Sequence, residues 1–196
     1  MDENSKEKTR ENIIRSAIIV FGKFGYKKAT MDDIAVAVGK GKTGLYYYFK
    51  NKEDVFKAVI EKEANELANA ISEAVNSSSN PVEKLKAYFF TRMNTLLKVS
   101  IFYEAMKSEV LDNLQFMNQT RLTYDKAELE LVKQILYDGI KQEYFELKDV
   151  ENSAITILTA LKGLEIPFFV QNRNHDFEKN IESLFNLICF GLIKRN

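Results

Sequence analysis

The chain has 196 residues, of which 45% are hydrophobic and 29% charged, a composition typical of a globular protein rather than a disordered one. No long apolar run and no signal-peptide pattern occurs, so we expect a cytoplasmic protein without a membrane span. A single cysteine, Cys189, and a single histidine, His175, exclude a disulfide framework and argue against a catalytic triad or metal cluster. We therefore expect no enzyme, no metal and no cofactor.

The formal net charge is zero, but the charges are unevenly distributed. Residues 1–52 carry 11 Lys and Arg against 6 Asp and Glu, a balance of +5, and residues 53–196 carry the compensating excess of acids. A basic segment on an acidic remainder is typical of a region that binds a polyanion. The sequence thus predicts two functional domains, 1–52 and 53–196.

The N-terminal segment is predicted to fold as three helices. Apolar residues at helical spacing predict the first over about residues 8–24. Thr30, followed three residues later by Asp33, predicts a capping box at the start of a second, short helix. A glycine-containing turn then leads to a third helix over about residues 42–49.

The rest of the chain shows long helical patterns with few prolines and glycines to interrupt them. No segment alternates between apolar and polar residues as a strand does, so the predicted fold class is all-α with about nine helices. The further predicted helices cover about 51–77, a segment starting at 81, 100–111, 113–142, a segment from 149 to about 166, and a segment from 176 to the end.

Two short helices joined by a glycine-containing turn have the geometry of a helix-turn-helix, whose second helix lies in the DNA major groove. Residues 40–52 suit such a recognition helix. Lysines can neutralise phosphates, a threonine can reach a base edge, a glycine allows close backbone approach, and tyrosine hydroxyls can bind phosphates. The candidates are Lys40, Lys42, Lys50, Lys52, Thr43, Gly44, Tyr46 and Tyr47.

Several motifs follow one another without gaps over residues 9–56. They include Thr9-Arg10-Glu11, Phe24-Gly25-Tyr26, Ala29-Thr30-Met31 and Leu45-Tyr46-Tyr47-Tyr48-Phe49. This run resembles the tetracycline-repressor (TetR) family. The resemblance implies a homodimeric, ligand-responsive transcriptional regulator, usually a repressor, with a helix-turn-helix domain and a helical ligand-binding and dimerisation bundle. The resemblance also implies which residues bind DNA. They are Lys42, Thr43, Gly44, Tyr46, Tyr47 and Lys52, already named as candidates, and also Thr30.

Two positions depart from the family pattern. Lys40 stands where the family usually has a small apolar residue, and Gly41 stands where it has a Ser or Thr cap. The family's base preference is therefore not transferable to this chain.

The recognition segment also admits other interpretations. Gly41-Lys42-Thr43 mimics the end of a phosphate-binding P-loop, but Val36 occupies the position of the required glycine, and a helix is predicted where a strand should precede. The tyrosine triplet could be ordinary core. Because only one face of a helix packs inward, we expect Tyr48 to be buried and Tyr46 and Tyr47 to face DNA.

The C-terminal part is rich in Phe and Met, which favours either a well-filled core or an adaptable apolar effector pocket between helices. Two arginines on otherwise apolar faces could anchor an anionic head group, or could be salt-bridged or reach outward. The candidate ligand-binding residues are Phe89, Arg92, Met93, Phe102, Met106, Met117, Arg121 and Tyr124.

A specific DNA site requires two helix-turn-helix copies, so we expect an interface between two chains. The last two helices are the best candidates for an isologous four-helix bundle. The predicted interface residues are Ile157, Leu161, Leu164, Ile181, Leu184, Phe185, Ile188 and Leu192.

The hypothesis for function is a homodimeric repressor that a small, largely apolar effector releases from a palindromic operator. One alternative is a structural, nucleoid-type DNA-binding protein without an effector. Another is an all-α enzyme or lipid carrier with a vestigial DNA-binding segment. The enzyme is disfavoured because no constellation of catalytic residues is visible.

Overall fold

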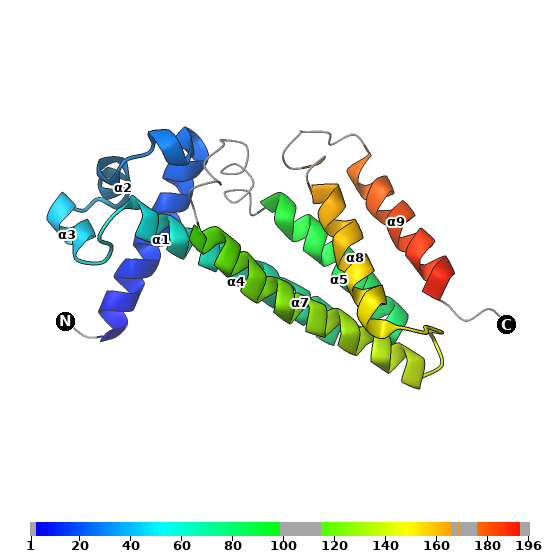
Figure 1. The fold of residues 1–196 in the computed structure, drawn as a ribbon. Coiled ribbons are helices and arrows are strands. Elements are labelled where there is room, and N and C mark those ends of the chain that lie inside the picture. The colour runs from blue at the N-terminus through cyan, green and yellow to red at the C-terminus, as the bar shows by residue number, and fades with distance from the viewer. Residues whose placement is uncertain (1–2, 99–114, 166–167, 169–175, 193–196) are drawn as a thin grey trace. The chain divides into compact units, whose positions relative to one another are not determined.

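The computed structural model of the chain describes residues 3–98, 115–165, 168 and 176–192. Within these ranges it contains helices and no strand, which confirms the all-α fold class (Figure 1). The predicted helix over 100–111 lies outside the described residues. The helices are α1 (Glu3–Lys28), α2 (Met31–Val38), α3 (Lys42–Tyr46), α4 (Lys52–Asn76), α5 (Pro81–Lys98), α7 (Gln115–Lys141), α8 (Val150–Glu165) and α9 (Phe177–Leu192).

The chain divides into two compact units. The described residues of the first unit are 3–64 and 115–120, and those of the second unit are 65–98, 121–165, 168 and 176–192. The helix α4 contributes its first half to the first unit and its second half to the second.

The first unit is built on a continuous apolar core. Helix α1 packs on α2, and α2 packs on α3. Phe21 and Phe56 meet edge to face with ring centroids 5.2 Å apart, an arrangement that aromatic pairs favour. The buried members are Ile13, Ile14, Ala17, Val20, Phe21, Ala29, Ile34, Ala35, Leu45, Phe49, Val55, Phe56, Ala58, Val59 and Ile60. The compact core therefore continues past residue 52, while the functional division at that residue stays a prediction.

Helix α1 is longer than the sequence predicts. It begins at Glu3 and continues to Lys28, although Gly25 interrupts it with a φ of 72° and a ψ of 159°. Positive φ is a conformation that glycine adopts without the steric cost of a Cβ atom. Gly25 thus breaks the regular helix where it was predicted to end, and one further turn follows before α2.

Helices of the second unit start at the predicted caps. The Asn80 side chain accepts a hydrogen bond from the Glu83 backbone N–H (3.0 Å), ahead of Pro81 in the first turn of α5. Asp149 accepts from the Asn152 N–H (3.0 Å) at the start of α8. These side chains satisfy backbone donors that a helix N-terminus leaves without an intrahelical partner.

The second unit closes its core with aromatic contacts. Helix α5 packs against α9, and the rings of Phe89 and Phe185 meet edge to face at 5.5 Å. After α7 the chain turns back, and the Phe145 N–H donates to the Gly139 carbonyl at 3.1 Å. The Phe145 ring lies so close to Gly139 that a Cβ atom there would be 2.0 Å from it. Among the described residues, none of the helices has the length and apolar character needed to cross a bilayer.

Candidate DNA-binding interface and effector site

Helix α3 ends at Tyr46, earlier than the predicted residue 49, so residues 47–49 follow it outside the helix. The segment 42–49 is buried on one side and exposed on the other. Leu45 is fully buried, Phe49 is 4% exposed, and Tyr48 packs against the same core. Tyr46 is 49% exposed and Tyr47 is 65% exposed. The predicted outward orientation of Tyr46 and Tyr47 is confirmed, whereas Tyr48, which was expected to be buried, is only partly buried. The contact of Tyr46 and Tyr47 with DNA stays a prediction.

Helix α2 begins with the predicted capping box. The Thr30 backbone N–H and hydroxyl donate to the Asp33 carboxylate at 2.9 and 2.6 Å, and the Asp33 N–H donates back to the Thr30 hydroxyl at 3.1 Å. These bonds, that of the hydroxyl first, hold the pKa of the Asp33 carboxyl below its ordinary value. The Thr30 side chain is exposed but already occupied, so its first role is to fix the start of α2.

The turn between α2 and α3 requires one glycine. Gly39 ends α2 with a φ of 70°, and its N–H donates to the Val36 carbonyl at 3.0 Å. Gly44 is different, because a Cβ atom there would meet only the Lys40 side chain at an ordinary 3.8 Å. Packing within the chain therefore leaves room for a side chain at position 44, and close approach of DNA stays the predicted reason for this glycine.

The lysines of the recognition segment have different surroundings. Lys40 is exposed, as is Thr43. Lys42 forms an ion pair with Asp32 of α2, with Nζ and Oδ2 2.6 Å apart. The hydrogen bond from Lys42 to this carboxylate raises the pKa of the ammonium above its ordinary value. Sequence reasoning missed Asp32 as a neighbour of the recognition helix.

Lys52 binds backbone groups of the first unit. Its ammonium donates to the backbone carbonyls of Tyr26 (2.7 Å), Ala29 (2.9 Å) and Lys27 (3.3 Å), and it lies 4.5 Å from the centroid of the Tyr26 ring. Burial lowers the pKa of Lys52 below its ordinary value. Because an ammonium has three protons to donate, this geometry favours a structural role that ties α4 to the end of α1.

Two further basic residues border the recognition helix. The Lys6 ammonium lies 6.0 Å from the Tyr47 ring centroid, and the Arg10 guanidinium lies 5.3 Å from that of Phe49. The two residues are four apart on α1 and so share a face. This spacing is visible in the sequence, but only the fold, which brings these two side chains beside Tyr47 and Phe49, makes it relevant.

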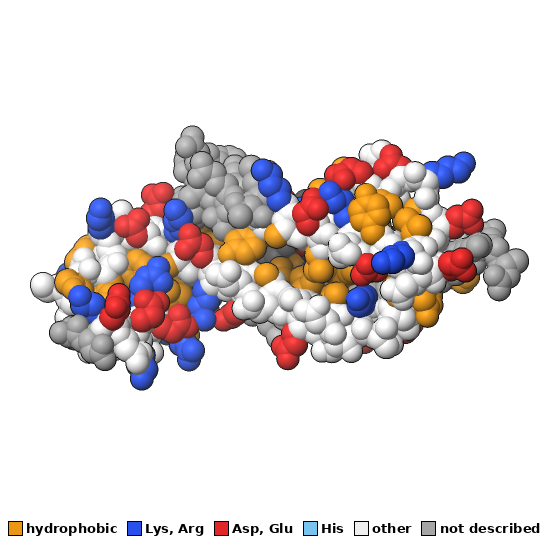
Figure 2. Space-filling view, turned by 90° about the horizontal axis from the view of Figure 1, so that it is seen from below, with side chains coloured by type: hydrophobic (Ala, Val, Ile, Leu, Met, Phe, Trp, Pro, Cys, Tyr) orange, Lys and Arg blue, Asp and Glu red, His pale blue; other side chains and the backbone are white. Residues whose placement is uncertain are grey.

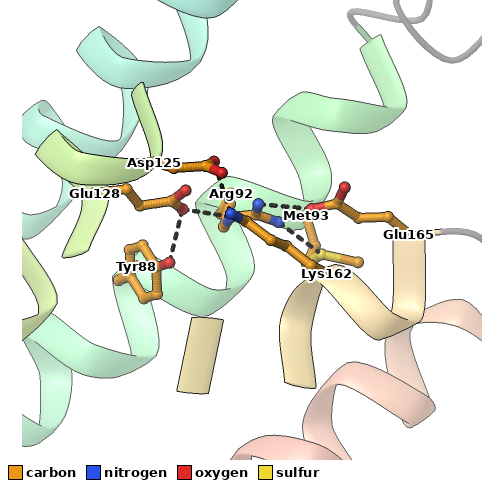
Figure 3. A network of polar contacts seen from close by, with 7 residues as sticks. All are labelled: Tyr88, Arg92, Met93, Asp125, Glu128, Lys162 and Glu165. Atoms are coloured by element: carbon orange, nitrogen blue, oxygen red, sulfur yellow. Dashed lines mark hydrogen bonds and ion pairs between the residues drawn. The ribbon is translucent and has the colours of Figure 1, made fainter. Parts of the chain in front are cut away.

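The second unit contains a buried network of charged side chains on three helices (Figure 3). Arg92 of α5 pairs with Glu128 of α7 and, at 2.6 Å, with Glu165 of α8. The Tyr88 hydroxyl donates to Glu128 at 2.7 Å, and an Arg92 nitrogen lies 3.7 Å from the Met93 sulfur. Arg92 and Glu165 are each 4% exposed. Of the roles considered for Arg92, the structure shows the salt-bridged one.

The environment of this network shifts two pKa values. Burial disfavours the charged form of Arg92, but Glu128 and Glu165 outweigh it and hold the pKa of Arg92 well above its ordinary value. Burial, followed by the negative charge of Glu128, raises the pKa of Tyr88 well above its ordinary value. Arg92 is therefore a cation and Tyr88 a neutral donor throughout the physiological range.

The structure brings together only part of the predicted effector site. Phe89 and Met93 are fully buried on α5 beside Arg92. Tyr124 is half-buried, and its hydroxyl donates to Asn65 at 3.0 Å. Phe102 and Met106 lie outside the described residues, and Met117 and Arg121 lie on α7 with side chains outside the description. In the part of the chain that is described, no group of three or more His, Cys, Asp or Glu residues is placed to hold a metal ion.

Comparison with known proteins identifies the family. The family model of bacterial regulatory proteins of the tetR family matches residues 13–59. YhgD, an HTH-type transcriptional regulator of Bacillus subtilis, is 31% identical over 153 residues, which cover 74% of this chain and 76% of that protein.

Two further proteins are similar over most of the chain. IcaR, the HTH-type negative transcriptional regulator of the biofilm operon icaADBC in Staphylococcus aureus, is 25% identical over 138 residues, covering 64% and 74% of the two chains. The structure of FadR from Bacillus subtilis, solved in complex with stearoyl-CoA, shares the fold with a TM-score of 0.75. It is 21% identical in sequence, and the match covers 91% of this chain and 97% of that chain. The chain belongs to the TetR family of DNA-binding transcriptional regulators.

Proposed function

We propose that the chain is a homodimeric repressor that binds a palindromic operator and is released from it by a small, largely apolar effector. The observation that carries the DNA-binding part is the presentation of α3. Buried Leu45 and Phe49 fix the helix, while Lys42, Thr43 and the exposed rings of Tyr46 and Tyr47 lie on its open side. A rigid support of this kind positions donors for phosphates and base edges.

The proposed DNA-binding residues differ in the role that we assign. Lys40, Lys42, Tyr46 and Tyr47 have exposed side chains and are proposed phosphate contacts, with Thr43 as the proposed base contact. Thr30 and Lys52 support the interface through the α2 cap and the α1 carbonyls. Gly44 is proposed to allow close approach of the DNA backbone.

Repression and effector release are supported by the similar proteins. IcaR is a negative regulator, and FadR was solved with stearoyl-CoA. In this chain the residues proposed around the effector include Phe89 and Met93, which are apolar. Arg92 already pairs with two carboxylates, so an anionic head group at this position would have to displace one of them. This favours an effector whose binding is dominated by its apolar part.

A dimer through the last two helices is proposed on a different face from the one predicted. Half of the predicted interface residues lie in the core of the single chain, since Ile157, Leu161, Ile181 and Phe185 are buried there. The exposed apolar residues of α8 and α9 are Ile155 at 44%, Leu187 at 73% and Phe190 at 73%. Leu187 and Phe190 lie three residues apart on α9 and so share a face, and neighbouring exposed apolar residues of this size are typical of a surface that another chain covers.

The proposed path from effector to DNA is helix α4. This single helix runs from Lys52 to Asn76, and its first half supplies buried core residues of the first unit, including Phe56. An effector can change DNA affinity only by binding two conformations of the dimer with different affinities. We propose that segment 1–52 reads DNA, that segment 53–196 binds effector and partner, and that α4 couples them.

The first experiment is enrichment of binding sites from a randomised duplex library at two salt concentrations. Recovery of a palindrome supports a dimeric, sequence-specific regulator, and its affinity should fall with salt by a slope of about 0.9 per phosphate neutralised. Salt-sensitive binding without an enriched sequence would support the structural, nucleoid-type alternative. Absence of binding at either salt concentration would support a carrier.

The dimer and effector proposals have their own measurements. Leu187→Glu should convert the dimer to a monomer in sedimentation experiments and weaken operator binding, whereas Glu182→Lys, on the same helix, should do neither. A screen of apolar compounds against the bound operator should find release that saturates with concentration. A dimer unaffected by Leu187→Glu would contradict the proposed face.

A further inference from the structure

The first turn of α2 places an acidic side chain against the first residue of α3. The Asp32 carboxylate and the Lys42 ammonium are 2.6 Å apart, and their side chains are 53% and 66% exposed. The pair therefore lies at the surface, where a molecule that binds along α3 can reach it. Figure 2 shows acidic and basic side chains interspersed over the α1–α3 part of the face seen there, rather than a continuous basic surface.

The neighbouring acid has another role. The Asp33 carboxylate is turned toward the start of α2, where it accepts hydrogen bonds from Thr30. Asp32 makes no part of this capping box and instead points across to α3. Its contact with Lys42 thus needs an explanation other than the helix cap.

A carboxylate and a phosphate bind the Lys42 ammonium in the same way. Both accept charge-assisted hydrogen bonds from its ammonium. The ammonium has protons for more than one acceptor, but a phosphate that approaches Lys42 also approaches Asp32, and the two anions repel each other. Asp32 and a DNA phosphate therefore compete for Lys42.

We propose that Asp32 is an intramolecular competitor of the DNA backbone, which holds Lys42 in the free protein and weakens DNA binding by about one phosphate contact. This inference rests on the proposed placement of α3 against DNA. Since non-specific DNA binding consists almost entirely of phosphate contacts, Asp32 limits retention of the regulator on DNA that is not its operator.

The test compares four full-length proteins: wild type, Asp32→Asn, Lys42→Gln and the double variant. Fluorescence anisotropy gives their affinity for the enriched operator and for a scrambled duplex over a range of salt concentrations. Glu146→Gln changes the net charge equally at an exposed site between α7 and α8 and serves as the charge control. Asp32→Glu keeps the carboxylate, and thermal unfolding shows whether each variant is folded.

Asp32→Asn should bind both duplexes about two- to fivefold more tightly, as expected when an exposed ion pair no longer has to be broken. Its salt slope should steepen by about 0.9, and Asp32→Glu should resemble wild type. The gain should shrink when Lys42 is already Gln. Unchanged or weaker binding by folded Asp32→Asn, or an equal gain with and without Lys42, would overturn the inference.

The outcomes also separate this inference from the proposed function. Wild-type binding to an enriched operator with no effect of Asp32→Asn would overturn the competitor role alone. If neither wild type nor Asp32→Asn binds any duplex, both the inference and the proposed function are contradicted.

Discussion

An ion pair in each unit of the chain shows how different the surroundings of charged residues can be. The core cluster around α1, α2 and α3 consists of apolar side chains, and the Lys42–Asp32 pair lies at its surface. In the second unit, Arg92 and Glu165 are buried, and Arg92 also pairs with Glu128, which is largely covered between the same helices. The ion pair beside α3 therefore lies at the surface of the first unit, whereas the ion pair between Arg92 and Glu165 lies inside the second unit.

This difference has an energetic meaning. An exposed ion pair loses little hydration, so the Lys42 side chain stays accessible to a molecule that binds along α3. Buried ion pairs lose hydration and are often no more stabilising than apolar residues of the same shape, although removal of one partner is costly. The second unit thus depends on a network that is sensitive to any change in one of its members.

Among the variants that test this comparison, Arg92→Met should lower the stability of the protein most. It leaves Glu128 and Glu165 buried without their shared cation, and should lower the free energy of unfolding by about 3–5 kcal/mol. Denaturant unfolding at fixed protein concentration measures this change. A triple variant that adds Glu128→Gln and Glu165→Gln should recover part of the loss. A loss below about 1 kcal/mol for Arg92→Met would contradict the picture of a buried, interdependent network.

Gly139→Ala tests packing in the same unit without changing a charge. The added Cβ would lie 2.0 Å from the Phe145 ring, so we expect a loss of about 1–3 kcal/mol in unfolding free energy. Gly163→Ala is the matched control on α8, because nothing lies within 4 Å of its Cβ. That control should be neutral or stabilise the helix by up to about 1 kcal/mol. Similar effects of both changes would refute the close contact with Phe145.

Lys52→Gln tests whether Lys52 of the first unit stabilises the fold or contacts a DNA phosphate. Loss of its bonds to the Tyr26 and Ala29 carbonyls should cost roughly 1–2 kcal/mol of unfolding free energy while leaving the salt slope of DNA binding unchanged. Lys50→Gln, at an exposed position, should show the reverse, with a slope smaller by about 0.9. A reduced salt slope for Lys52→Gln would assign this residue to a phosphate.

The smallest expected effect is a pH dependence of the unfolding free energy that comes from an ion pair in the first unit. Glu11 contacts Lys62 at 2.7 Å, and the hydrogen bond from Lys62 lowers the pKa of this carboxyl below its ordinary value. The contribution to stability is present above the unfolded pKa and is lost as the pH falls through the lower folded pKa. Since both side chains are partly exposed, it should be below about 1 kcal/mol. Glu11→Gln should remove this part of the acid dependence of unfolding, and an unchanged dependence would contradict it.

The sequence predicted the local structure of the first unit because that structure depends on neighbours within one helical turn. The capping box joins Thr30 to Asp33, three residues apart. Leu45 and Phe49, four residues apart, are both buried as predicted, although α3 ends at Tyr46. The same periodicity predicted that Tyr46 and Tyr47 face outward. The caps Asn80 and Asp149 were visible for the same reason.

The sequence by itself thus determined the all-α class, the helix-turn-helix and the family, since periodicity, caps and contiguous motifs are local properties. Tertiary structure alone decided that Arg92 pairs with Glu128 and Glu165, that Lys52 binds carbonyls of a preceding helix, and that Lys42 meets Asp32. These contacts join different helices, and no spacing along one helix specifies which faces of two helices meet. Packing angles and the burial of shared apolar surface determine that, and they depend on the folded chain as a whole.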